Sequence, residues 1–181
     1  MMEGWIADVD RFWFEELPSE AWFRRDEAVD AMIRARFGTL HERLKRDGAA
    51  RAPATPAGAL AAVIVLDQFP RNMFRDSPAA YATDAAALDL AQRAVDAGFD
   101  RGLDVHRRQF LYLPFMHSED PAMQARSVAL FRELGDAEAL DFAARHQAII
   151  DRFGRFPHRN AILGRASTAA EIEFLKTNPG F

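Results

Sequence analysis

The sequence predicts an all-α protein of about eight antiparallel helices arranged as helical hairpins. Apolar residues recur at spacings typical of helices along most of the chain, capping residues and prolines separate these segments, and no segment alternates convincingly between apolar and polar residues. The chain has 181 residues, 49% of them hydrophobic, which is enough to form one sizeable core. We therefore expect residues 1–181 to form a single all-helical domain.

The first two expected helices carry bulky apolar faces. Trp5, Val9 and Trp13 lie on one face of an N-terminal helix because they are four residues apart. A long amphipathic helix starts near Asp26, and Gly48 is expected to end it. These faces are predicted to contribute to the core.

The most apolar segment, residues 58–66, is predicted to be the central buried helix. A loop at residues 51–56 precedes it, and Thr55 followed by Pro56 is typical of a helix start. The segment is apolar on all sides, so we expect other helices to surround it.

The later helices are predicted from their capping residues and their stops. The expected starts are Ser77, Asp104, Asp120, Asp136 and Thr168. The helix that starts at Asp104 is expected to end at Tyr112, before Pro114, and the next to last helix is expected to run to about residue 153. Thr168 together with Glu171 predicts a capping box.

A basic segment stands out in this acidic chain. Residues 152–165 contain four arginines and a histidine, no acidic residue occurs from 152 to 170, and the chain has a formal charge of -4. Residues 67–75 repeat part of the pattern, because both segments read Phe-Pro, a basic residue and then Asn. We expect these segments and residues 117–119 to gather around His146 and form a polar, net basic pocket.

Asp67 is the most informative carboxylate in the sequence. It lies near the expected end of the most apolar helix, where the helix dipole disfavours a negative charge. It therefore needs a cation, and the candidates are Arg71 and, through space, Arg155 or Arg159. One interpretation is a structural ion pair that locks two loops. In the other, the arginines present their remaining donors to an anionic ligand.

The leading functional hypothesis is the binding of a small anionic molecule. Arg71, Arg155 and Arg159 are expected to be the anion donors, His117 and His158 hydrogen-bond or proton-transfer groups, and Asp67 and Glu119 orienting carboxylates. The full set of candidate ligand-binding residues is Asp67, Gln68, Arg71, Asn72, His117, Glu119, His146, Arg155, His158, Arg159 and Asn160.

Several alternatives remain open at the level of sequence. A helical-repeat scaffold could bind a peptide or a partner protein. An enzyme, including a metal-assisted hydrolase, could use His117, Glu119 and His158 for acid–base chemistry. No metal or cofactor is predicted, although His117, Glu119, His146 and His158 would be the ligands of a less favoured metal site. The sequence pI of about 5.7 argues against nucleic-acid binding.

The expected location is the cytoplasm, without membrane insertion. The chain contains no cysteine, and residues 1–18 are too acidic for a signal peptide. The longest apolar run, residues 57–66, is about half of the ~20 residues that a membrane span requires.

Several motifs closely resemble the bacterial family catalogued as domain of unknown function 924. This resemblance spans nearly the whole chain and implies an all-helical fold similar to tetratricopeptide-repeat arrays, but it implies no reaction. The matching motif positions include every candidate ligand-binding residue except His146. The motifs are Phe12-Trp13-Phe14, Trp22-Phe23, Leu66-Asp67-Gln68-Phe69-Pro70-Arg71-Asn72, Tyr81-Ala82-Thr83-Asp84, Leu113-Pro114-Phe115-Met116-His117-Ser118-Glu119 and Phe153-Gly154-Arg155-Phe156-Pro157-His158-Arg159-Asn160 through Ser167-Thr168.

Overall fold

The computed structural model describes residues 4–47 and 54–179, and all regular secondary structure in these ranges is helical. The α-helices are α1 (Gly4–Arg11), α2 (Glu27–Asp47), α3 (Pro56–Val63), α4 (Phe69–Met73), α5 (Asp84–Asp96), α6 (Val105–Met116), α7 (Pro121–Leu134), α8 (Ala137–Phe153) and α9 (Ala169–Thr177). If the unbroken run from α3 to α4 counts as one helix, these described ranges contain eight, which confirms the predicted all-α class.

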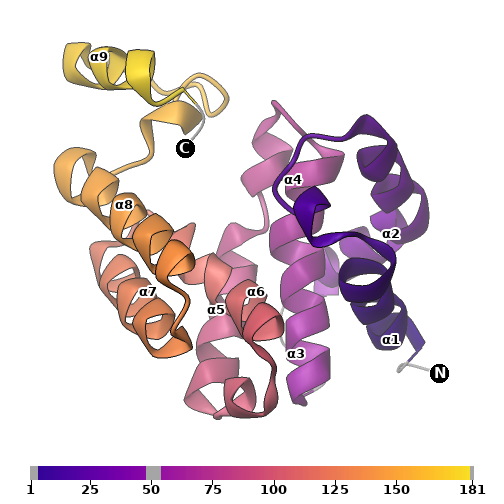
Figure 1. Ribbon diagram of the computed structural model, residues 1–181. Coiled ribbons are helices and arrows are strands. Elements are labelled where there is room, and N and C mark those ends of the chain that lie inside the picture. Colours follow the sequence, from indigo (N-terminus) through magenta and orange to yellow (C-terminus); the bar gives the residue numbers. More distant parts are fainter. Residues whose placement is uncertain (1–3, 48–53, 180–181) are drawn as a thin grey trace.

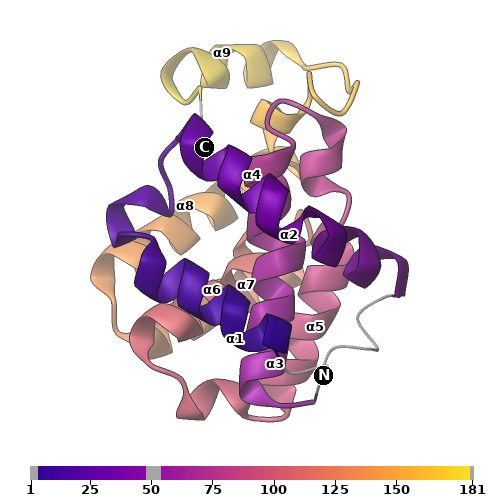
Figure 2. The same cartoon turned by 90° about the vertical axis from the view of Figure 1, so that its right-hand side faces the viewer.

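The helices follow one another across the molecule (Figure 1). Helices α1 and α2 lie on one side, α3 to α6 occupy the middle, and α7 and α8 form the other side. Helix α9 lies at one end of the molecule, away from α1 and α3 (Figure 1, Figure 2). One apolar cluster contains side chains from α1 through α8, and a smaller cluster lies next to α9.

Helix α3 is the central buried helix, as predicted. Thr55 Oγ1 accepts a hydrogen bond of 3.1 Å from the backbone N–H of Gly58, and Pro56 is the first helical residue. Every residue from 58 to 70 is buried. Helix α3 packs against α1, α5 and α6, which surround its apolar faces. The predicted stop at Gly48 and the first residues of the predicted loop, 51–53, lie outside the described residues.

The helix does not end at Asp67, contrary to the prediction. It continues through the π-helical turn Ile64–Gln68 into α4, although Pro70 lies in its path. A proline has no N–H to donate to the carbonyl four residues earlier, here that of Leu66. Thr83 Oγ1 replaces this donor with a hydrogen bond of 2.6 Å to Leu66 O. Asp67 is therefore in the interior of a helical run.

Helix α6 also continues past a proline, so the predicted end at Tyr112 is wrong. It includes Pro114 and ends at Met116. An interior proline costs about 3 kcal/mol, but the continuation buries Phe115 and Met116, each of which contributes about 1.5–3 kcal/mol. Ser77 was predicted to start an α-helix. It caps a 3-10 turn, Pro78–Tyr81, and α5 begins later, at Asp84.

The C-terminal helices begin at the predicted caps. Asp120 and Asp136 cap α7 and α8, and Thr168 and Glu171 form the predicted capping box of α9. None of the helices in the described ranges is long and apolar enough to span a membrane.

Candidate functional site

A pocket of about 290 Å3 lies where the three predicted segments meet. Its walls come from α4, the 3-10 turn Pro78–Tyr81, the residue after α6, helix α8 and the 3-10 turn Pro157–Arg159. The structure thus brings residues of segments 67–75, 117–119 and 152–165 together with His146. The described residues that line the pocket include four arginines but only one carboxylate, that of Asp76.

Arg71 forms the base of the pocket and is heavily hydrogen-bonded. Its Nη1 and Nη2 atoms donate to the two carboxylate oxygens of Asp84 at 2.8 and 2.9 Å, and Nη1 also donates to the Asp67 carbonyl at 2.6 Å. Burial by itself would lower the pKa of Arg71, but the charges of Asp67 and Asp84 outweigh burial and raise it. Arg71 is therefore a fixed positive charge.

Asp67 lies behind Arg71 and is fully buried. Its Oδ1 is 2.8 Å from His117 Nδ1 and 3.4 Å from Arg71 Nη1, and its Oδ2 accepts a hydrogen bond of 2.5 Å from Gln68 Nε2. Burial would raise the pKa of Asp67, but Arg71, His117 and the hydrogen bonds together lower it. The carboxyl is therefore ionised, and Arg71 is the partner among the predicted candidates that the structure supports.

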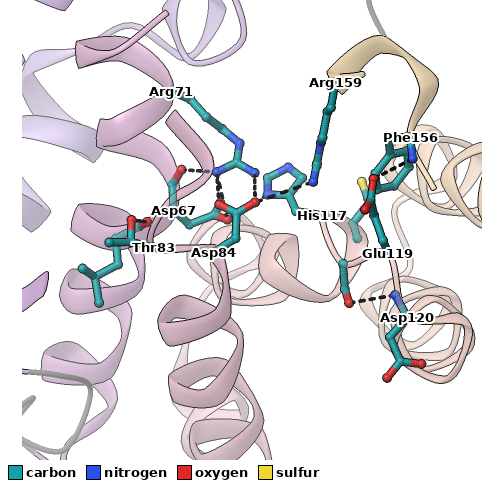
Figure 3. A network of polar contacts seen from close by, with 12 residues as sticks. Asp67, Arg71, Thr83, Asp84, His117, Glu119, Asp120, Phe156 and Arg159 are labelled. Carbon is teal, nitrogen blue, oxygen red and sulfur yellow. Dashed lines mark hydrogen bonds and ion pairs between the residues drawn. The ribbon is translucent and has the colours of Figure 1, made fainter. Parts of the chain in front are cut away.

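Arg159 approaches Asp84 from the opposite side (Figure 3). The residue is only 7% exposed, and its Nη1 lies 3.7 Å from Asp84 Oδ2, which is an ion pair but not a hydrogen bond. Its guanidinium carbon lies 4.8 Å from the centroid of the Tyr81 ring and 4.5 Å from that of Phe156. Its Nε is buried, and no described residue forms a hydrogen bond with it. Burial, followed by the charge of Arg71, lowers the pKa of Arg159.

Three histidines complete the pocket, and burial keeps them neutral. The pKa of His146 is lowered to about 4 and that of His158 to about 3, in both cases chiefly by burial. Burial and then the charge of Arg71 lower the pKa of His117. The Phe156 ring lies 5.5 Å from the His146 ring and 5.7 Å from the His158 ring, measured between centroids. Near neutral pH the positive charge of the pocket therefore comes from its arginines.

The three predicted residues with amide side chains lie outside the pocket wall. Gln68 is bound to Asp67, and Asn72 Nδ2 donates to Asp30 Oδ1 at 2.8 Å. Asn160 is used within its own loop, where it accepts a hydrogen bond from Arg165. These amides hold the surrounding structure in place.

Arg155 and Glu119 also lie outside the pocket wall. Arg155 donates to both carboxylate oxygens of Glu171, at 2.7 and 2.8 Å, so it tethers α9 instead of pairing with Asp67. Glu119 accepts hydrogen bonds from the backbone N–H of Phe156 and from Arg165. Both charged groups are thus occupied in fixing the loop after α8. Within residues 4–47 and 54–179, no group of three His, Asp or Glu side chains is arranged to hold a metal ion.

The candidate residues chosen from the sequence did not include Asp84 or Tyr81, nor the charged pocket residues Arg25, Arg75 and Asp76. Asp84 lies between Arg71 and Arg159. The centroid of the Tyr81 ring lies 5.6 Å from the guanidinium carbon of Arg71 and 4.8 Å from that of Arg159. Asp84 looks like an ordinary acidic residue in the first turn of a helix. The available signal was that both residues belong to the motif Tyr81-Ala82-Thr83-Asp84.

Comparisons with known proteins agree with this structure. The family model for bacterial proteins of unknown function, DUF924, matches residues 9–179. A solved structure of a protein of unknown function from Agrobacterium tumefaciens is similar over 95% of this chain and 97% of its own, with 39% sequence identity and a TM-score of 0.90. A search of the curated proteins gave no match. The chain therefore belongs to the DUF924 family of bacterial proteins of unknown function.

Proposed function

We propose that the pocket binds a small oxyanion at Arg159, with Arg71 adding positive charge from the far side of Asp84. The observation that carries this proposal is the state of Arg159, a residue that is 7% exposed and whose side chain forms no hydrogen bond with any described residue. Buried charged groups are normally hydrogen-bonded, because an unpaired buried donor costs about 1–3 kcal/mol or more. An anion in the pocket would supply the missing acceptors.

The two arginines differ in what they can offer. Both terminal nitrogens of Arg71 are already bound to Asp84, so Arg71 contributes mainly its charge and position. Arg159 is held by aromatic rings and a long ion pair, so its planar set of donors remains available for a carboxylate or phosphate. Arg159 is therefore the main anion donor.

The size of the pocket limits the ligand. A volume of about 290 Å3 is at the lower end of the range for small-molecule sites, roughly 300–1,000 Å3. This space suits phosphate, a small carboxylic acid or a small phosphate ester better than a dinucleotide. Peptide binding stays an untested alternative. It would need a groove of exposed apolar side chains, and the five large ones that are exposed in the described residues each belong to a different segment.

The test is isothermal titration calorimetry at low salt with three probes: inorganic phosphate, sulfate and malonate. We expect at least one of these anions to bind. In Arg159→Met the affinity should fall by tenfold or more, because a hydrogen bond to a charged group contributes about 1.5–3 kcal/mol. Arg93→Met is the matched control, since it removes the same charge from the exposed surface of α5, where Arg93 pairs with Asp89. Circular dichroism and melting curves would verify that both variants are folded.

Two results would contradict the proposal. One is a wild-type protein that binds none of the three anions at millimolar concentration. The other is an Arg159→Met variant that is folded and binds as tightly as the Arg93→Met control.

A further inference from the structure

We infer that the pocket selects an oxyanion that still carries an acidic hydrogen, and that His117 Nε2 accepts this hydrogen. The inference rests on the proposed anion site and specifies its ligand further. The ligand class is hydrogen phosphate or a phosphate monoester that retains one proton, in preference to an anion such as sulfate that has only acceptors. The argument starts from the contact between Asp67 and His117.

The Asp67 contact fixes which ring nitrogen of His117 carries the hydrogen. Asp67 Oδ1 and His117 Nδ1 are 2.8 Å apart, and one of these two atoms must donate. The Asp67 carboxylate already accepts from Gln68 and lies next to the Arg71 guanidinium, an environment that keeps it ionised. An ionised carboxylate can only accept hydrogen bonds. The hydrogen is therefore on His117 Nδ1.

The other ring nitrogen of His117 is consequently a hydrogen-bond acceptor. Burial and the charge of Arg71 lower the pKa of His117, so the ring is neutral near pH 7 and carries only one hydrogen. With that hydrogen on Nδ1, Nε2 has a lone pair. No described residue donates to His117 Nε2, and His117 lines the pocket. A ligand in the pocket thus meets donors from Arg159 and an acceptor from His117.

This combination distinguishes between anions of equal charge. Near pH 8 sulfate and most of the inorganic phosphate each carry about two negative charges, but only hydrogen phosphate has an O–H group. Sulfate would place an oxygen lone pair against the lone pair of His117 Nε2 and leave that acceptor unpaired. Sites that hydrogen-bond a specific group of the ligand reject analogues that lack the group, because the polar atoms of the site remain unsatisfied.

The experiment compares phosphate with sulfate at about pH 8 and constant ionic strength, by isothermal titration calorimetry on the full-length protein. We expect phosphate to bind roughly tenfold or more tightly than sulfate. In His117→Phe, which lacks the acceptor, the preference for phosphate should disappear, because phosphate loses its acceptor and sulfate no longer meets the lone pair of Nε2. Long-range 1H–15N NMR of the wild-type protein provides a second measurement that needs no variant, and it should show the hydrogen of His117 on Nδ1.

The outcomes separate this inference from the proposed function. If phosphate and sulfate bind equally well, or if sulfate binds more tightly, the inference is overturned and the anion site remains. An NMR spectrum with the hydrogen of His117 on Nε2, or a folded His117→Phe variant that keeps the preference for phosphate, also overturns it. If neither anion binds, the inference fails, and failure of malonate as well would overturn the anion site itself.

Discussion

At the scale of single residues, the site depends on Arg71 and Arg159 sharing the single carboxylate of Asp84. Asp84 accepts two hydrogen bonds from Arg71 and has only a 3.7 Å ion pair left for Arg159. The charge of Arg71 also lowers the pKa of Arg159, which shows that the two guanidinium groups repel each other. The pocket therefore holds positive charge that its own carboxylates do not fully satisfy.

Asp84→Asn should tighten anion binding. The substitution removes a negative charge that competes with the ligand, while the amide oxygen can still accept one hydrogen bond from Arg71. We expect the dissociation constant of phosphate to fall by roughly tenfold, which corresponds to about 1.4 kcal/mol. The melting temperature without ligand should fall, because Arg71 and Arg159 lose their shared counter-charge. Weaker phosphate binding by a folded Asp84→Asn variant would mean that Asp84 chiefly orients Arg71.

The residues of the site were only partly predictable. The sequence indicated that Asp67 needs a cation, and Arg71, one helical turn further on, is that partner at 3.4 Å. The sequence could not decide between Arg155 and Arg159. Gly154 adopts a left-handed conformation with φ of 68° and ends α8, after which the chain turns Arg155 towards Glu171 and Arg159 into the pocket. Such directions depend on the tertiary path of the loop.

At the scale of elements, capping residues predicted helix starts correctly, whereas prolines did not predict helix ends. The caps at Thr55 and Thr168 are local interactions between neighbouring residues, and both are formed as predicted. A helix was expected to end before Pro114, and the central helix was expected to end near Asp67, yet Pro70 and Pro114 both lie inside helical runs. The hydrogen bond lost at Pro70 is replaced by one from Thr83, and the cost of Pro114 is offset by the burial of Phe115 and Met116. Sequence reasoning from local propensity does not include these tertiary terms.

The same capping substitution should have different effects at the two helices. Thr55→Ala removes the cap of the central helix, so the free energy of global unfolding should fall by about 1 kcal/mol. Thr168→Ala removes the cap of α9, which lies at the edge of the molecule and contacts α8 through Phe174 and Phe153, with ring centroids 5.1 Å apart. Its amides should exchange roughly fivefold faster while the global midpoint stays nearly constant. Urea unfolding and native-state hydrogen exchange measure the two effects, and an equal loss of global stability in both variants would show that α9 unfolds together with the core.

At the scale of the whole molecule, the pocket requires the complete arrangement of helices. Arg71 comes from α4, His117 follows α6, His146 lies on α8 and Arg159 lies beyond it. The all-α class and the meeting of these segments followed from the sequence, since helical caps and the repeated motif indicated them. The neutral state of the histidines could not be predicted from the sequence, because it follows from their burial, which is a property of the assembled structure.

Partly buried, neutral histidines make the stability of the molecule depend on pH. The pKa is lowered to about 4 for His146 and about 3 for His158, whereas histidines in the unfolded chain titrate near 6.5. Below about pH 6.5 the unfolded state therefore binds more protons than the native state, and the free energy of unfolding falls as the pH is lowered towards 4. Each of these histidines contributes up to about 1.4 kcal/mol per pH unit.

Urea unfolding at about pH 7, 6 and 5 measures this dependence. His158→Gln should have a shallower slope of unfolding free energy against pH than the wild-type protein, because one protonation difference between the two states is removed. His106→Gln, on the exposed surface, is the matched control for the loss of a histidine. Equal slopes in the two variants would contradict the neutral, buried state of His158.

The pocket also depends on the number of residues in the π-helical turn Ile64–Gln68. A π turn holds about one residue more than an α turn, so removal of one residue from Ile64–Gln68 would leave an ordinary α turn. Loss of that residue would restore a regular helix but rotate the side chains before it by about 100° relative to those after it. Asp67 and Arg71 would then no longer face Asp84 and His117 together. A single-residue deletion in this turn should therefore keep a stable helix but disrupt the pocket.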